Sequence, residues 1–209
     1  AWQGDGTGAQ DAFILRELRR AFEVVPVDPA FETLPGAADV LLMIHPAPLS
    51  EAQAYAVDQF LLRKGRALIA VDPAARVALA QGGARAVPAS SLGMLERTLG
   101  ASVGSSVVAD RALALPVETD AGGGRRVVEG QPLFIAAPRA LMSDEDPVTS
   151  DLTRAVNFGD AGAITAQGEG VTRLAPLVMT TEMAALVDAD FAMQEPAPRE
   201  VLAVYQAAG

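Results

Sequence analysis

The sequence predicts an α/β fold with a mostly parallel sheet, helices on both of its faces, and a β-hairpin added in the second half of the chain. Two apolar segments, residues 39–45 and 67–71, have the composition of strands that are covered on both faces. A helical pattern separates them, and a strand–helix–strand unit with a short return is right-handed and places its strands in parallel. Helix and strand patterns alternate through the first half, which favours the same class.

The elements of the first half follow from apolar spacing and from signals at their ends. Ser50 and Gln53 form a capping box at the start of a helix, and Gly65 stands where the residue after that helix is expected. Thr7 and Gln10 offer a similar box to an earlier helix. The predicted elements are a helix over residues 14–22, a β-rich run over 22–28, a strand over 39–45, a helix over 50–64 and a strand over 67–71.

The second half has shorter and weaker patterns. Residues 167–170, Gln-Gly-Glu-Gly, are typical of a hairpin turn between two strands. Residues 122–124, all glycine, predict a turn between two further strands. The predicted elements are helices over 92–99, 151–156 and 181–190, strands over 103–109, 113–118, 126–129, 133–136, 161–166 and 171–179, and a strand or short helix over 201–205.

Composition limits the classes of protein to which the chain can belong. With 209 residues that are 50% hydrophobic, the chain is expected to form one soluble domain over residues 1–209 rather than to be disordered. It has no cysteine, which excludes thiolate metal sites and a cysteine nucleophile. A net charge of -10 argues against nucleic acid as a partner. Because the chain lacks a starting methionine, a leader and a long apolar run, we expect either a processed protein or an excised soluble piece, with any membrane anchor outside these residues.

Several motifs contain residue types found in reactive sites, but their context differs from that of such sites. Residues 100–104 match G-x-S-x-G, but a nucleophile elbow needs a strand before Ser102, and here a helix pattern precedes it. The glycine-rich residues 4–8 lack both a preceding strand and a phosphate-binding lysine. The acidic residues 144–146 do not continue into the spacing of a calcium loop. His45 ends a strand and is the only histidine, which favours packing over metal binding. The sequence thus predicts no cofactor, no metal site and no catalytic residue.

The segment 39–73 resembles the auxiliary domain of ABC-type transport systems related to the gliding-motility transporter component. The resemblance rests on an apolar strand beginning Asp-Val-Leu, a proline, Leu-Ser opening a helix, and a second apolar strand ending in Asp-Pro. The matching residues are Asp39, Val40, Leu41, Pro46, Leu49, Ser50, Tyr55, Ala56, Asp58, Gln59, Phe60, Arg63, Gly65, Asp72 and Pro73. His45 and Lys64 stand where the family often has glycine. Weaker similarity continues at residues 95–100, 146–149 and 177–181.

This resemblance implies a flavodoxin-like fold, or one close to class I glutamine amidotransferases but without their cysteine. It also implies a domain on the extracytoplasmic (periplasmic) side of an inner-membrane protein. Its partners would be the permease and ATPase subunits of an ABC transporter, reached through the full-length protein, with a polysaccharide or lipid-linked cargo as a further ligand. We expect such a domain to act by binding rather than by catalysis.

Two other functions are compatible with the sequence. A small-ligand or carbohydrate-binding module would use a cleft beyond the strand ends, because ligands of open α/β sheets bind there. The residues expected at that ligand or partner cleft are His45, Pro46, Asp72, Pro73 and Thr180. The low aromatic content weakens a sugar-stacking site. A carboxylate-dependent hydrolase is the other alternative, although no pair of carboxylates stands out.

Overall fold

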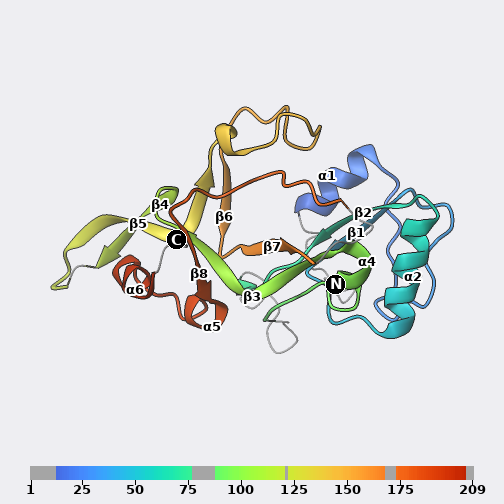
Figure 1. Cartoon of the computed structure of the whole chain (residues 1–209), viewed down its shortest axis with the longest axis horizontal. Coiled ribbons are helices and arrows are strands. Elements are labelled where there is room, and N and C mark those ends of the chain that lie inside the picture. Colours follow the sequence, from blue (N-terminus) through green and yellow to red (C-terminus); the bar gives the residue numbers. More distant parts are fainter. Residues whose placement is uncertain (1–12, 77–87, 121, 168–172, 206–209) are drawn as a thin grey trace. The chain divides into compact units, whose positions relative to one another are not determined.

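The computed structural model describes residues 13–76, 88–120, 122–167 and 173–205 (Figure 1). The chain divides into two compact units. Unit 1 contains residues 1–70 and 93–95, and unit 2 contains residues 71–92 and 96–209. A single domain over the whole chain stays a prediction from its length.

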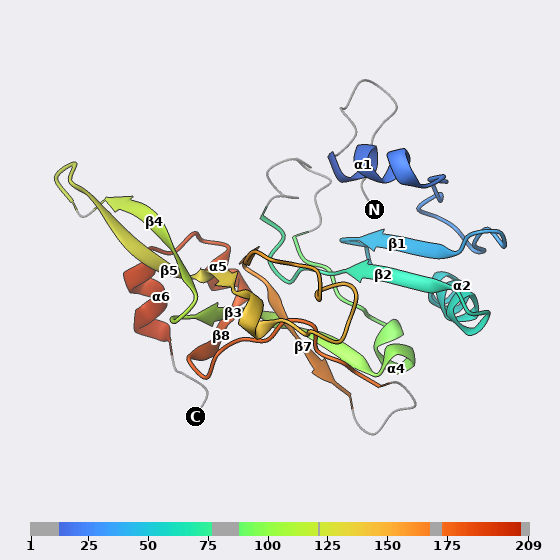
Figure 2. The ribbon, with the colours of Figure 1, turned by 90° about the horizontal axis from the view of Figure 1, so that it is seen from above.

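Unit 1 is built around the predicted strand–helix–strand segment. Strand β1 (Val40–Ile44) pairs in parallel with β2 (Arg66–Ala70), with Leu42 opposite Leu68. Helix α2 (Glu51–Leu62) connects the two strands, and Figure 2 shows them side by side. Helix α1 (Phe13–Ala21) precedes them in the chain. The parallel pairing and both helices confirm the prediction for this part, whereas Thr7 and Gln10 lie outside the described residues.

The two ends of α2 show why the sequence folds this way. Ser50 Oγ accepts a hydrogen bond from the Gln53 backbone N–H (3.3 Å), and the Gln53 side chain accepts from the Ser50 N–H (2.8 Å), so the capping box is complete. At the other end Lys64, not Gly65, takes the left-handed conformation (φ +70°). Gly65 is required for another reason: a Cβ there would lie 2.6 Å from the backbone oxygen of Phe60.

Unit 2 contains two antiparallel sheets in its described residues. The first has the order β7–β3–β8, and the second has the order β4–β5–β6. Strands β3 and β5 bring the two sheets into contact. The strands are β3 (Ala101–Asp110), β4 (Ala114–Asp120), β5 (Arg126–Ala137), β6 (Val156–Gly159), β7 (Gly162–Ala166) and β8 (Ala184–Asp188). Helices α5 (Ala189–Ala192) and α6 (Pro198–Val204) follow β8, and a 3-10 turn η2 (Arg139–Leu141) follows β5.

The core of unit 2 lies between β3, β5, β8 and the last two helices. Val107, Ala109, Leu133, Val187 and Val201 are all 5% exposed or less and pack together with three buried alanines. Phe134, Phe191, Met193 and Tyr205 pack against this cluster from its margin. Because small side chains dominate, the core depends on close approach of the backbone rather than on large aromatic groups.

The prediction of a mostly parallel, flavodoxin-like sheet is wrong. Among the strands that the structure describes, β1 and β2 form one parallel pair, while the other pairings are antiparallel. For β4 and β5 the physical reason is local, since a short turn can join only antiparallel neighbours. Gly122, Gly123 and Gly124, all with positive φ, lie in such a turn between β4 and β5. Strand β3 pairs with β7 and β8, which lie more than 50 residues further along the chain, so no local pattern indicates their direction.

Individual elements of the prediction have mixed outcomes. Helix α4 (Leu95–Leu99) ends at Gly100 (φ +64°) as expected, and the last element is a helix, α6. Residues 22–28 form no strand, and residues 151–155 form no helix before β6. The predicted helix 181–190 is mainly the strand β8, followed by the short α5. The predicted hairpin partner of residues 161–166 is replaced by β3, and in residues 173–179 only Val178 forms an isolated bridge, with Met142.

Candidate functional site

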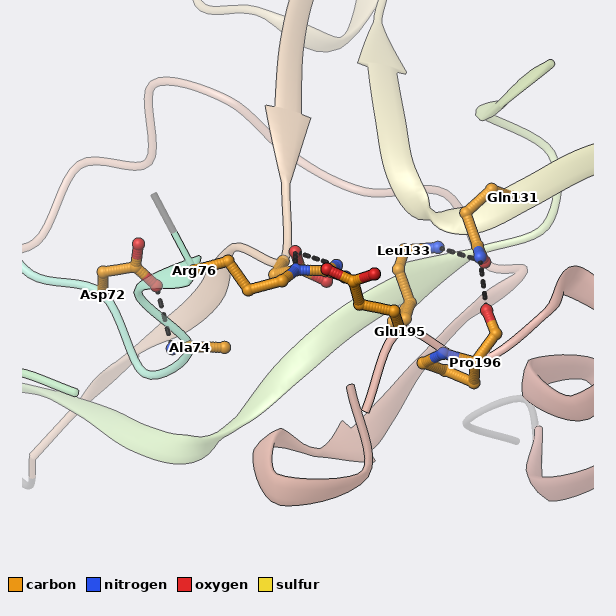
Figure 3. Close-up of polar contacts among 8 residues, drawn as sticks. Asp72, Ala74, Arg76, Gln131, Leu133, Glu195 and Pro196 are labelled. Atoms are coloured by element: carbon orange, nitrogen blue, oxygen red, sulfur yellow. Dashed lines mark hydrogen bonds and ion pairs between the residues drawn. The ribbon is translucent and has the colours of Figure 1, made fainter. Parts of the chain in front are cut away.

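A cluster of charged side chains in unit 2 is the strongest candidate for a site in the described residues. Its centre is an ion pair in which Nε and Nη2 of Arg76 both donate to Oδ2 of Asp160, the Nε bond being 2.8 Å long. Glu195 Oε1 lies 4.0 Å from Nη1 of the same guanidinium (Figure 3). The Arg76 guanidinium also lies 5.5 Å from the centroid of the Phe134 ring. One cation therefore faces carboxylates from two different loops.

Local structure holds these carboxylates in place. Asp160 lies in the turn between β6 and β7 with φ +49°, and its N–H donates to the Leu133 carbonyl (3.1 Å). Glu195 follows α5 with φ +55°. The next residue, Pro196, accepts a hydrogen bond from the buried Gln131 side chain (2.9 Å, Figure 3). Both acidic residues adopt a backbone conformation that favours glycine, and such strain persists only where the surroundings enforce it.

The electrostatic balance of the cluster is unfavourable to an ionised Asp160. This residue is 5% exposed, and burial raises the pKa of its carboxyl above the ordinary value, although the hydrogen bond and charge of Arg76 act in the opposite direction. Asp72 and Glu195 raise the pKa further. Oδ1 of Asp160 is buried and has no hydrogen-bond partner in the described residues. The cluster thus connects three segments of the chain by charge interactions, and one acceptor atom in it, Oδ1 of Asp160, is unsatisfied.

A second buried carboxylate, Asp110 at the end of β3, is fully satisfied. It is 0% exposed and accepts bonds from the N–H groups of Ala112 (2.9 Å) and Thr181 (2.8 Å) and from the Thr181 hydroxyl (2.9 Å). These bonds anchor the chain just before β8 to the end of β3. Because its acceptor positions are occupied, Asp110 positions segments of the fold and does not offer a free carboxylate for a reaction.

The residues predicted for a ligand or partner cleft fall in both units. In unit 1, His45 has φ +46° and its N–H donates to the Ala70 carbonyl (2.8 Å), while Pro46 is buried. In unit 2, Asp72 Oδ1 accepts from the Ala74 N–H (2.9 Å), which closes a turn around the buried Pro73. Thr180 is exposed. Asp72 is the one of these residues that takes part in the electrostatics of the Arg76 cluster.

The other motifs behave as local structure. Ser102 lies in β3 directly after the α4–β3 turn, and its hydroxyl is hydrogen-bonded to Thr165 of β7 (3.0 Å), which confirms a helix-to-strand turn in place of a nucleophile elbow. Asp144 pairs with Arg139, and Asp146 caps the Val148 N–H (2.9 Å). The described part of the chain contains no group of three or more metal-ligating side chains. None of its helices has the length and apolar character that crossing a bilayer requires.

Sequence reasoning missed Arg76, Asp160 and Glu195. Arg76 and Asp160 are 84 residues apart and no motif spaces them, so nothing local to either residue predicts the pair. One weak signal exists for Asp160, because the segment Phe-Gly-Asp-Ala-Gly has the composition of a tight turn between two strands. A charged residue in such a turn is ordinarily solvated, and its burial here depends on packing that is visible only in three dimensions.

Comparison with known proteins supplies the identity that the geometry alone does not. The chain matches no curated protein and no solved structure. It does match, over residues 3–208, the family described as "ABC-type uncharacterized transport system". The match covers both units and the whole Arg76 cluster. This chain therefore belongs to the family of auxiliary proteins of ABC-type transport systems.

Proposed function

We propose that the chain is an extracytoplasmic, non-enzymatic accessory domain of an ABC-type transport system related to the gliding-motility transporter. It acts by binding protein partners, namely the permease and ATPase subunits, which it reaches through the full-length protein. The observation that carries this proposal is the family match over residues 3–208. A polysaccharide or lipid-linked cargo would be a further ligand of the same assembly.

The chemistry of the described residues supports binding over catalysis. Two donors of Arg76 are engaged by Asp160, and the acceptor positions of Asp110 are filled by backbone and hydroxyl donors. Ser102 has a hydroxyl neighbour, Thr165, and lies on a strand without an adjacent general base. The charged groups of the site are therefore used to hold segments together, which is what a rigid binding scaffold requires.

The proposal is tested by co-purification of the protein as its gene encodes it. An affinity-tagged copy, expressed at its natural level, is extracted in mild detergent and analysed by mass spectrometry. We expect an ABC permease and its ATPase to be recovered in fixed proportion, and to be absent when an unrelated tagged membrane protein is used instead. Recovery of the tagged protein without either subunit would contradict the proposal.

The side of the membrane is tested separately. We expect residues of this chain to be cleaved by protease added to the outside of spheroplasts and to be protected in inverted vesicles. The reverse pattern would place the domain in the cytoplasm and contradict the extracytoplasmic part of the proposal.

A further inference from the structure

A shallow apolar groove runs beside strand β8 in unit 2. It is lined by Leu186, Val187, Asp188, Phe191 and Val204 and has a volume of about 240 Å³. Leu186 is 63% exposed and Val204 is 50% exposed. A concave surface lined by apolar side chains is typical of a binding site for another apolar group rather than of an ordinary solvated face.

The backbone of β8 is open on the side away from β3. In the order β7–β3–β8, β8 is an edge strand with one described neighbour. The Val108 N–H donates to the Ala161 carbonyl at the β7 side, so Val107 and Ala109 turn their backbone groups toward β8. In the antiparallel register Val107 pairs with Val187 and Ala109 with Ala185. The N–H and C=O of Leu186 therefore point to the open edge.

Strand β8 lacks two of the features that block strand addition at an exposed edge, namely proline and charges along the strand. Exposed edges are commonly protected by proline or by charged side chains along the strand. Strand β4 illustrates such protection, since it carries Pro116, Glu118 and Asp120. Strand β8 reads Ala-Ala-Leu-Val-Asp, with no proline and a single charge at its end. Its open edge is consequently able to accept an extended segment.

Charge limits the kind of segment that fits. Asp188 is the one charged residue of the groove lining, and it is exposed, with Oδ1 accepting from the Phe191 N–H (3.1 Å). Asp190, two residues further on, is also exposed. No described cation forms an ion pair with either carboxylate. The negative charge of this rim, on a chain of net charge -10, is complementary to a basic side chain.

We infer that the groove receives an extended, basic and apolar segment of a protein partner, which adds as a strand along β8. This inference rests on the proposed function, because it names the surface and the partner chemistry of that binding role. Leu186 and Asp188 are two positions apart and point to the same face of the strand. The segment therefore carries an apolar side chain for the groove and, two residues away, a lysine or arginine for Asp188. Backbone bonds to Leu186 give the addition its register.

The test uses chain 1–209 and fluorescently labelled peptides of about eight residues, long enough to form a strand. One peptide repeats Val-Thr-Lys-Thr, and its matched control replaces each lysine by glutamate. Binding is followed by fluorescence anisotropy. We expect the lysine peptide to bind, the glutamate peptide not to bind, and the affinity to fall as salt is added because the ion pair with Asp188 is screened. Equal binding of the two peptides, or no binding of the lysine peptide, would overturn the inference.

Two matched variants locate the binding. Leu186→Lys places a positive charge in the groove and is expected to weaken the lysine peptide about tenfold or more, as loss of a central interface contact does. Ile164→Lys is the control, since Ile164 is 64% exposed on β7, the other edge strand of the same sheet. Circular dichroism checks that both variants keep their fold. An equal effect of the two variants would show that the peptide does not bind at β8.

The same variants separate this inference from the proposed function. Suppose that the wild-type protein and Ile164→Lys co-purify with the transporter subunits and Leu186→Lys does not. This result would support the groove as the surface that contacts the transporter. If Leu186→Lys keeps the subunits, the groove is excluded as the contact surface and the accessory role stands. If the wild type itself recovers no subunit, the accessory role fails, and the peptide measurements still decide whether β8 accepts a strand.

Discussion

Replacing Arg76 by methionine is expected to destabilise unit 2 by about 3 kcal/mol at neutral pH. Methionine keeps most of the apolar stem, so the change removes the charge and the two bonds to Asp160 rather than the packing. Asp160 would then be a buried carboxylate, 5% exposed, facing Asp72 and Glu195 with no cation. Removing one partner of a buried ion pair has a known range of free-energy costs, and we expect the lower end of that range here because a fifth of the Arg76 side chain is exposed.

The opposite substitution, Asp160→Asn, is expected to behave differently. The pKa of Asp160 is raised above 3.8, chiefly by burial, so the folded state binds the proton more tightly than the unfolded state does. The contribution of this group to stability is then greatest below pH 3.8 and falls as pH rises toward and through the raised pKa. Asparagine removes that penalty. At neutral pH the Asp160→Asn protein should be at least as stable as the wild type, and its advantage should shrink in acid.

Urea unfolding followed by far-ultraviolet circular dichroism at about pH 4 and at neutral pH measures both effects. The cost of Arg76→Met should be smaller at the acid pH, where protonation of Asp160 removes the uncompensated charge. A variant with both substitutions should recover most of the stability lost in Arg76→Met. The reasoning is refuted if Asp160→Asn costs as much as Arg76→Met at neutral pH, because the ion pair would then outweigh burial.

Three further substitutions test the local structure by shifts of the urea midpoint. Ser50→Ala removes the side-chain cap of α2 and should cost about 1 kcal/mol, whereas Ser50→Asp should cost little. Gly65→Ala brings a methyl group against Phe60, whose side chain is 4% exposed, and should cost about 1–3 kcal/mol; a wild-type midpoint would show that α2 ends differently. Asp110→Ala leaves the half-buried donors of Thr181 without their acceptor and should cost about 3 kcal/mol, with Thr181→Val as the partner variant for a double-mutant cycle.

The strand–helix–strand segment of unit 1 was predictable because its signals are local. The capping box at Ser50 involves residues three apart, and the apolar runs of β1 and β2 are each contained in five residues. Short, well-capped elements with a short return also leave one handedness and one relative strand direction. Where sequence neighbours make the decisive contacts, the pattern and the structure agree on the elements and their pairing. The prediction that both strands are covered on both faces is wrong, since Val40 is 57% and Leu68 is 61% exposed.

Unit 2 was harder to predict because its decisive contacts are distant in sequence. Strand β3 pairs with β7 and with β8, whose nearest residues are more than 50 and more than 70 positions away. No pattern within a window of ten residues indicates such pairings, so extending the parallel arrangement of unit 1 to the second half of the chain predicts the wrong sheet. The Arg76 cluster was unpredictable for the same reason, since it joins segments that are distant in sequence and that the antiparallel pairing brings together.

The wrong prediction of a helix at residues 181–190 shows which contribution to the free energy determines the structure of this segment. Alanine is the best helix former, and this segment contains Ala184, Ala185 and Ala189, so intrinsic propensity favours a helix. Burial in the structure instead alternates along β8, with Ala185 and Val187 inside and Leu186 outside. A period of two buries these side chains against β3, and that tertiary gain exceeds a few tenths of a kcal/mol per residue of helix propensity. The same alternation leaves Leu186 exposed at the sheet edge, so the error in secondary structure also hid the groove from sequence reasoning.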